Sequence, residues 1–207
     1  MQTATRKKFW NDHYRKGSST SSGRPGTALA QFTAPLTPGT VLELGCAKGD
    51  DAIWLARRGW QVTAVDVSSV ALDLAAKNAR QAGVSENLRF EEHDLAVSFP
   101  QGSFDLVTAS FLHAPQDWPR AKVLRQAADA VDTGGHLLIV DHGSRAPWSW
   151  APEDTVYPTA EDTLASLELV ESTWQRCCVC PISRMTTGPE GQSAIVTDTI
   201  IFLRHLN

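Results

Sequence analysis

Residues 41–51 read Val-Leu-Glu-Leu-Gly-Cys-Ala-Lys-Gly-Asp-Asp, and the fold class can be argued outward from this stretch. Its first four residues are almost all apolar, which is typical of a short strand covered on both faces. Gly45 and Gly49 permit a tight turn and a close approach of the backbone to another group. From Asp51 to Arg58, apolar side chains recur on one side of a predicted helix. The stretch therefore predicts a buried strand that passes through a glycine loop into a helix.

The same alternation continues along the chain. Further strands are predicted at residues 61–65, 88–91, 104–109 and 136–140, with helices at 68–82 and 118–131. Ser68 and Gly83 are a typical N-cap and C-terminal glycine for the first of these helices. Strands that alternate with helices favour a parallel sheet with helices on both faces. Two later strand-like stretches, at about 168–180 and 194–204, flank a turn-rich loop and predict a β-hairpin.

Length and charge restrict the class of protein. A chain of 207 residues with 42% hydrophobic and 20% charged residues suits one globular domain. The net charge of −4 and the lack of a Lys/Arg stripe argue against a nucleic-acid partner. No apolar run approaches the roughly 20 residues that span a bilayer, and the N-terminus does not resemble a signal peptide. We therefore expect a cytoplasmic protein without a membrane partner.

Cysteine usage supports the same expectation. The chain has four cysteines, and three of them crowd together: Cys46, Cys177, Cys178 and Cys180. The crowded group lacks the paired C-x2-C spacing of a zinc site. We expect three small, reduced side chains in a strand and no metal site. A metal site or a redox switch is the alternative interpretation.

Ligands of open α/β sheets bind beyond the carboxyl ends of the strands. Asp66 ends the second predicted strand 21 residues after Gly45, a spacing that suits an acid binding ribose hydroxyls. A dinucleotide fingerprint would need glycines where this chain has Ala47 and Asp50. Asp50 and Asp51 would also face a pyrophosphate at the helix N-terminus. The pattern therefore favours a cationic ligand without phosphate.

Residues 43–49 resemble the E/D-x-G-x-G-x-G motif of class I S-adenosylmethionine-dependent methyltransferases, with Ala47 in place of the middle glycine. Segments 65–68, 93–95, 104–107 and 134–138 are similar to further motifs of that family, in order and spacing. The resemblance covers about residues 38–207. It implies an α/β fold with a Rossmann-like, doubly wound, seven-stranded sheet, mostly parallel with an antiparallel C-terminal hairpin. It also implies S-adenosyl-L-methionine as cofactor, with S-adenosyl-L-homocysteine as product.

A second resemblance concerns the N-terminal segment. Residues 9–14 and 49–56 look like the small-molecule methyltransferases of the tellurite-resistance and thiopurine type. In that group an N-terminal helix folds over the cofactor, so Trp10 and Tyr14 would shield it from water. We predict a single domain over 1–207, with 1–37 as a helical lid and 38–207 as the core.

The family resemblance assigns roles to individual residues. Asp66 would bind the ribose, Asp94 would face the adenine amino group, and Glu43 would position the glycine loop or the methionine amine. Ser110 would offer a backbone contact after the fourth strand. The full set of expected cofactor contacts is Trp10, Tyr14, Glu43, Gly45, Cys46, Ala47, Gly49, Asp66, Val67, Asp94, Leu95 and Ser110.

Residues of the methyl-acceptor site are less determined by the sequence. His113 and His142 follow the fourth and fifth strands on the same rim and are the candidate catalytic residues, each with a structural role as the alternative. Trp148 and Trp150 could wall an acceptor pocket, and Arg24 and Arg145 could meet an acidic acceptor or the methionine carboxylate. We expect methyl transfer to a small-molecule acceptor by in-line displacement. The alternatives are an NAD- or nucleotide-binding oxidoreductase, a nucleic-acid or protein methyltransferase, and a non-enzymatic adenosyl-cofactor-binding protein; the oligomeric state stays open.

Overall fold

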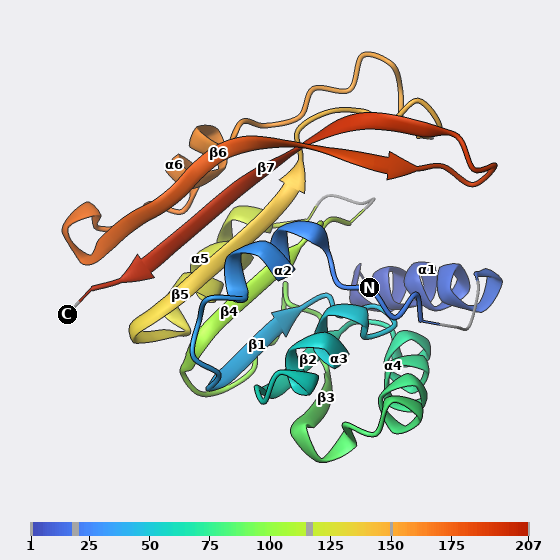
Figure 1. The fold of residues 1–207 in the computed structure, drawn as a ribbon, viewed down its shortest axis with the longest axis horizontal. Helices are drawn as coiled ribbons and strands as arrows, with labels where there is room; N and C mark the ends of the chain where they lie inside the picture. The colour runs from blue at the N-terminus through green and yellow to red at the C-terminus, as the bar shows by residue number, and fades with distance from the viewer. Residues whose placement is uncertain (1, 18–20, 115–117, 150, 207) are drawn as a thin grey trace.

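The computed structural model describes residues 2–17, 21–114, 118–149 and 151–206, which form a seven-stranded sheet in the order β3-β2-β1-β4-β5-β7-β6 (Figure 1). Neighbouring strands from β3 to β5 are parallel, whereas β7 runs antiparallel to both β5 and β6. The predicted α/β fold class is therefore confirmed. The strands are β1 (Thr40–Leu44), β2 (Gln61–Asp66), β3 (Leu88–Glu92), β4 (Phe104–Ser110), β5 (Val131–His142), β6 (Trp174–Thr187) and β7 (Ser193–His205).

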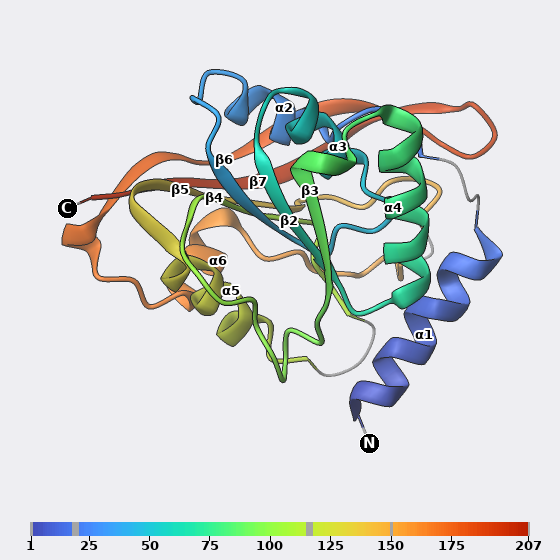
Figure 2. The same ribbon diagram turned by 90° about the horizontal axis from the view of Figure 1, so that it is seen from below.

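Helices cover both faces of the sheet (Figure 2). Two buried apolar clusters fill the layers, one where α2 and α3 pack on the sheet and one where α5 and α6 pack on the opposite face. The first helix, α1, lies outside these layers and packs against α4. The helices are α1 (Gln2–Lys16), α2 (Thr27–Thr33), α3 (Asp50–Arg57), α4 (Ser69–Ala82), α5 (Arg120–Asp129) and α6 (Ala160–Ser166), with short 3-10 turns at Ser85–Asn87 and Glu171–Thr173.

The helix ends follow the predicted local chemistry. The Ser68 side chain accepts a hydrogen bond from the Ala71 amide at the start of α4, and Gly83 ends that helix at φ 70°. Thr159 and Asp162 form the capping box of α6. These side chains satisfy amides that have no partner within their own helix. Both caps are visible in the sequence as local patterns.

Several element boundaries differ from the sequence-based expectation. Helix α5 ends at Asp129 rather than residue 131, because Val131 already pairs with Phe104 as part of β5. Gly134 lies within β5 at φ 83°, where the register against β4 shifts. Strand β6 begins only at Trp174. These shifts move no residue of the glycine loop.

The expectation of fully reduced cysteines is wrong for this structure. Cys178 and Cys180 are joined by a disulfide, while Cys46 and Cys177 are free. Residues two apart in a strand project to the same face, which brings the two sulfurs together. Within the described residues, no three His, Cys, Asp or Glu side chains group as a metal site. No helix in those same ranges is long and apolar enough to cross a membrane.

Candidate functional site

The glycine loop between β1 and α3 is held against the end of the neighbouring strand. The amides of Gly45 and Cys46 both donate to the Val65 carbonyl, at 2.8 and 2.9 Å. Gly45, Ala47 and Gly49 all have left-handed backbone, with φ of 74°, 50° and 83°. Ala47 is the position where the family motif has glycine, and a Cβ there costs roughly 1–2 kcal/mol. The turn is thus kept despite the substitution.

Asp66 lies at the end of β2, directly beside this loop. Its carboxylate accepts hydrogen bonds from the Ala47 amide (3.0 Å) and from the Ser68 amide (2.9 Å). The residue is only 7% exposed. Burial raises the pKa of Asp66 to about 6, although these backbone donors act in the opposite direction. The two amides fix the orientation of an acid whose remaining lone pairs can accept hydrogen bonds from a ligand.

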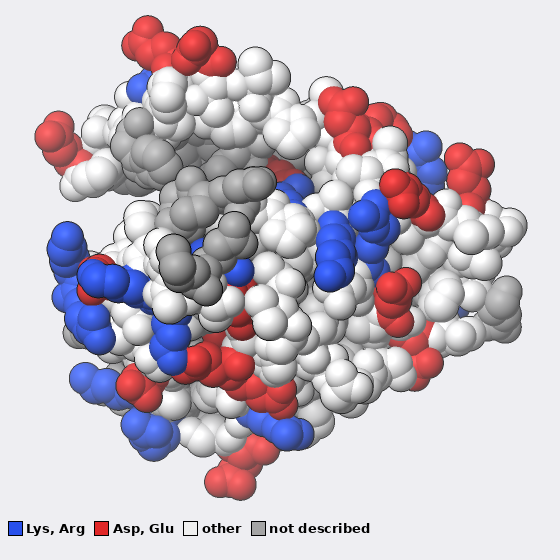
Figure 3. All heavy atoms as spheres, turned by 180° about the vertical axis from the view of Figure 1, so that it is seen from behind, with Lys and Arg blue, Asp and Glu red and all other residues white. Residues whose placement is uncertain are grey.

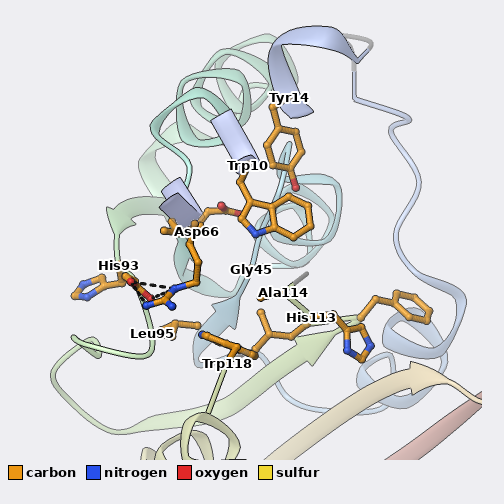
Figure 4. Close-up of a pocket in the computed structure, with 14 residues that line it drawn as sticks. Trp10, Tyr14, Gly45, Asp66, His93, Leu95, His113, Ala114 and Trp118 are labelled. Atoms are coloured by element: carbon orange, nitrogen blue, oxygen red, sulfur yellow. Dashed lines mark hydrogen bonds and ion pairs between the residues drawn. The ribbon is translucent and has the colours of Figure 1, made fainter. Parts of the chain in front are cut away.

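Helix α1 forms the roof of the site (Figure 4). Arg6, Trp10 and Tyr14 are spaced four residues apart, so they share one helix face. Arg6 forms an ion pair with Asp94 at 2.7 Å, in which the two side chains are 5% and 6% exposed. A second anchor joins the Asn11 side chain to the Ser68 hydroxyl at 2.7 Å. Polar contacts at two places therefore hold the roof over the ends of the strands.

Asp94 pairs with a side chain of α1. The family resemblance assigns it to an adenine amino group, but in the structure its carboxylate accepts three hydrogen-bond contacts from the Arg6 guanidinium. Burial acts to raise the pKa of Asp94, yet the hydrogen bonds from Arg6 and its charge hold that pKa below the usual value. Asp94 still lines the pocket under α1. Its main visible role is to anchor the roof.

A pocket lies between this roof, the glycine loop and the segment after β4. It holds about 100 Å3. The Leu112 side chain lies close to Gly45, where an added Cβ would come within 2.8 Å of Leu112 Cδ1. The expected site residues in its lining are Trp10, Tyr14, Gly45, Asp66, Val67, Asp94, Leu95 and His113. The lining residues that sequence reasoning missed are Arg6, His93, Phe111, Leu112, Ala114 and Trp118. Of these, Arg6 was detectable as the next position of the Trp10–Tyr14 helix face.

Other expected contacts lie outside that lining. These are Glu43, Cys46, Ala47, Gly49, Ser110 and His142. Glu43 and Cys46 are buried beneath the loop, and burial raises the pKa of both side chains, with nearby carboxylates adding to the effect. The Glu43 Oε2 atom makes no hydrogen bond among the described residues. Glu43 is therefore a buried residue next to the loop rather than a residue of the pocket lining.

Asp50 and Asp51 hold a neighbouring segment of the chain rather than lining the pocket. The Ser21 hydroxyl and the Gly23 amide (2.9 Å) donate to Asp50, and the Gly26 amide donates to Asp51 at 2.6 Å. Burial raises the pKa of Asp51. Asp50 and Asp51 thus bind residues 21–26 to the N-terminus of α3. Their position in the sequence alone favours a cationic ligand instead.

The two candidate catalytic histidines lie near each other after β4 and at the end of β5. The rings of His113 and His142 are 6.0 Å apart, and His142 stacks on Phe111 at 4.4 Å. His113 Nε2 is 3.5 Å from Asp141 Oδ1, and Asp141 also accepts from Arg120. Burial lowers the pKa of both imidazoles. Only His113 lines the pocket.

The remaining acceptor-side candidates separate into different places. Arg24 lines a second cavity, which adjoins the first. Arg145 donates to the carbonyls of Ser149 and Ala151, so it closes its own loop. The Trp148 ring packs against Gly188 in the hairpin turn. Trp150 lies outside the described residues.

Charges are mixed on the face shown in Figure 3. Lys and Arg side chains gather toward the edge where α1 lies, and acidic side chains lie among and beside them. Lys7 on this helix, for example, pairs with Glu92 at the end of β3.

Comparisons with known proteins find methyltransferase relatives for part of the chain. Residues 41–135 match the family model described as "Methyltransferase domain". Methyltransferase GfsG of Streptomyces halstedii is 34% identical over 105 residues, which is 49% of this chain and 37% of that protein. A ubiquinone biosynthesis O-methyltransferase of Ralstonia nicotianae is 34% identical over 111 residues, or 53% of this chain and 45% of that protein. The chain thus spans less than half the length of these relatives.

Solved structures resemble the fold over nearly the whole chain. TehB from Haemophilus influenzae superimposes with a TM-score of 0.67 at 16% identity, covering 94% of this chain and 66% of that one. A structure described as "Conversion of a Disulfide Bond into a Thioacetal Group during Echinomycin Biosynthesis" gives a TM-score of 0.74 at 23% identity, covering 97% and 93%. At these identities the likeness concerns the fold.

Proposed function

Because this chain belongs to the class I S-adenosylmethionine-dependent methyltransferases, we propose that it transfers a methyl group to a small-molecule acceptor. The observation that carries the proposal is the placement of Asp66. Its carboxylate is held by the Ala47 and Ser68 amides beside the glycine loop and faces a pocket roofed by Trp10 and Tyr14. This is the arrangement that a ribose needs.

The residues around Asp66 fit an adenosyl group by their chemistry. The fixed carboxylate accepts hydrogen bonds from ribose hydroxyls, and Val67 and Leu95 offer apolar contact to a base. Leu112 must move off Gly45 for a nucleoside to enter, because the pocket is otherwise smaller than the roughly 300–1,000 Å3 of small-ligand sites. In this proposal residues 1–37 act as the lid, and residues 38–207 form the core.

The protein contributes alignment and exclusion of water. When bound, S-adenosylmethionine supplies the methyl group and a positively charged sulfur as leaving group. Trp10 and Tyr14 cover the pocket from α1, which keeps water from the reacting atoms. His113, which lines the pocket in its neutral form, can accept a proton from an acceptor that must lose one. A soft anionic acceptor needs no base, so we infer that positioning is the main catalytic contribution.

Calorimetry with S-adenosylhomocysteine and with NAD tests the cofactor assignment. We expect S-adenosylhomocysteine to bind and NAD not to bind. Binding of NAD alone would favour the oxidoreductase alternative and overturn the proposal.

A panel of small acceptors then tests the substrate class. Thiols, selenite, tellurite, phenols and amines cover soft and hard nucleophiles, and disulfides are added because of the echinomycin-related structure. The relation to a ubiquinone biosynthesis O-methyltransferase supports the phenol arm. Methylation of a protein or a nucleic acid, with no small acceptor used, would contradict the small-molecule proposal.

The two histidines provide the test of mechanism. We expect His113→Ala to lower turnover about 100-fold for a protonated acceptor and much less for a thiolate, since only the former needs a base. His142→Ala, outside the pocket lining, is expected to act more weakly. Single-turnover rates are compared with S-adenosylhomocysteine affinity. A loss beyond about a thousandfold at unchanged affinity would refute catalysis by positioning.

A further inference from the structure

A second cavity of about 300 Å3 adjoins the pocket under α1, and Phe111 lines both. Its walls come from three parts of the chain: residues 22–29, the ends of β4 and β5, and the β6–β7 hairpin. Phe111 follows β4 directly and has φ of 51°, a left-handed conformation that is rare for a large side chain. The cavity therefore opens beside the site proposed for the cofactor, and any role for it in catalysis rests on that proposed function.

The floor of the cavity is apolar, whereas its charged groups lie on two walls. Leu29, Phe111 and Val140 line the floor. Asp198 on β7 is 3% exposed and bonds to the Arg184 guanidinium, which lies 5.8 Å from the Phe111 ring centre. The buried carboxylate is therefore already neutralised by an arginine from the adjacent strand.

Arg24 adds a second guanidinium to the same cavity. Its backbone is fixed by hydrogen bonds with the Ser22 hydroxyl, but its exposed guanidinium makes no hydrogen bond or ion pair with any described residue. Asp198 is the only carboxylate among the described lining residues, and it is paired. Asp50 and Asp51 lie beside the same segment, but their carboxylates accept from the Gly23 and Gly26 amides, so no described carboxylate pairs with the Arg24 guanidinium.

Arg24 is held at this wall by the acids that follow the glycine loop. Asp50 accepts from the Gly23 amide and Asp51 from the Gly26 amide, so both neighbours of the Arg24–Pro25 pair are tied to α3. Ordering the backbone in advance reduces the entropy that a ligand-binding side chain loses on binding. The backbone that carries the Arg24 side chain is therefore fixed, while the guanidinium itself is left without a bond to any described residue.

We propose that this cavity is the acceptor site and that it selects small acceptors carrying a carboxylate on a compact apolar body. The carboxylate binds Arg24, with the remaining donors of Arg184 beside it, and the apolar body lies on Leu29 and Phe111. Guanidinium groups match carboxylates with two parallel hydrogen bonds. The nucleophilic end of the acceptor then points past Phe111 toward the first pocket.

Binding of matched acids and amides tests this proposal without needing turnover. Benzoate and benzamide, and hexanoate and hexanamide, are titrated by calorimetry into protein saturated with S-adenosylhomocysteine. We expect at least one acid to bind about tenfold or more tightly than its amide, as hydrogen bonds to a charged group allow. Arg24→Gln should abolish that preference, Arg24→Lys should keep part of it, and Arg80→Gln, an exposed arginine on α4, should leave it unchanged.

The same titrations separate the two hypotheses. If S-adenosylhomocysteine does not bind, the proposed function fails. If it binds but neither acid is preferred over its amide, or if Arg24→Gln keeps the full preference, the acceptor assignment is overturned. As an independent check, 4-mercaptobenzoate should show a lower KM than 4-mercaptobenzamide in the unmodified protein and an equal KM in Arg24→Gln. Equal KM values in the unmodified protein would also refute the proposal.

Discussion

The two cavities of this molecule are built in opposite ways. The pocket under α1 takes its key parts from the ends of β1 and β2, where a short continuous motif leads to Gly45 and an acid at a fixed spacing supplies Asp66. The second cavity combines Arg24 with Arg184 and Asp198 of the β6–β7 hairpin, which lies far from Arg24 in the chain. Under the two proposals, the cofactor site is therefore encoded by residues close together in the sequence, whereas the acceptor site is assembled only by the tertiary structure.

The largest expected effect comes from removing the ion pair that anchors α1 over the first pocket. In Arg6→Gln the buried Asp94 carboxylate loses its partner, and we expect unfolding to become easier by about 3–5 kcal/mol. Arg89→Gln, which breaks an exposed pair with Glu91, should cost no more than about 1 kcal/mol. Urea denaturation measures both. Equal losses in the two variants would show that the roof is not anchored by this pair.

The Arg6 effect should also depend on pH. The pKa of Asp94 is lowered in the folded protein, so the stabilisation is present above the unfolded pKa of about 3.9 and is lost as pH falls through the folded value. The stability gap between the unmodified protein and Arg6→Gln should therefore be widest above about pH 5 and shrink below about pH 4. A gap that widens on acidification would contradict the assignment.

Asp66→Asn attacks the same pocket at its proposed ribose contact. We expect S-adenosylhomocysteine to bind about 10–100-fold more weakly, because an amide replaces a charged acceptor. The pKa of Asp66 is about 6, so affinity of the unmodified protein should fall as pH drops through this value, and the variant should give a flatter profile. Asp73→Asn, exposed on α4, is the control. Unchanged affinity in Asp66→Asn would remove the main support for the cofactor site.

A pair of glycines separates backbone strain from contact in the pocket. Gly45 and Gly83 have φ of 74° and 70°, so alanine at either should cost roughly 1–2 kcal/mol of stability. A Cβ at Gly45 also meets Leu112 Cδ1 at 2.8 Å, whereas one at Gly83 meets nothing within 4 Å. Only Gly45→Ala should therefore weaken S-adenosylhomocysteine binding. Equal affinities in calorimetry would show that the glycine loop does not contact the ligand.

The smallest effect concerns the substituted motif position. Ala47 has φ of 50°, so Ala47→Gly removes strain but adds freedom to the unfolded chain. The net result should be a gain of no more than about 1 kcal/mol, measured by thermal unfolding, with ligand affinity unchanged. A clear loss of stability would mean that the Ala47 methyl group makes contacts that the loop depends on.

The features that are predictable from the sequence divide in the same way as the two cavities. Strand periodicity, the glycine loop and the position of Asp66 are predictable because they depend on neighbours in the chain. The partner of Asp94 is not, since Arg6 lies 88 residues away. From the sequence, Asp50 and Asp51 look like partners of a cationic ligand. Their actual partners, the amides of residues 23 and 26, come near them only in the folded chain and are therefore not predictable.

The β6–β7 hairpin carries Arg184 and Asp198 on adjacent antiparallel strands, and it joins the rest of the sheet through β5 alone. The buried Asp198 carboxylate and the Arg184 guanidinium that neutralises it are therefore carried by the same hairpin. Exchange of this hairpin between related proteins would replace both at once, without leaving a buried carboxylate unpaired. Under the acceptor proposal, replacing this one hairpin would change the acceptor side of the reaction while the strands that carry the glycine loop stay the same.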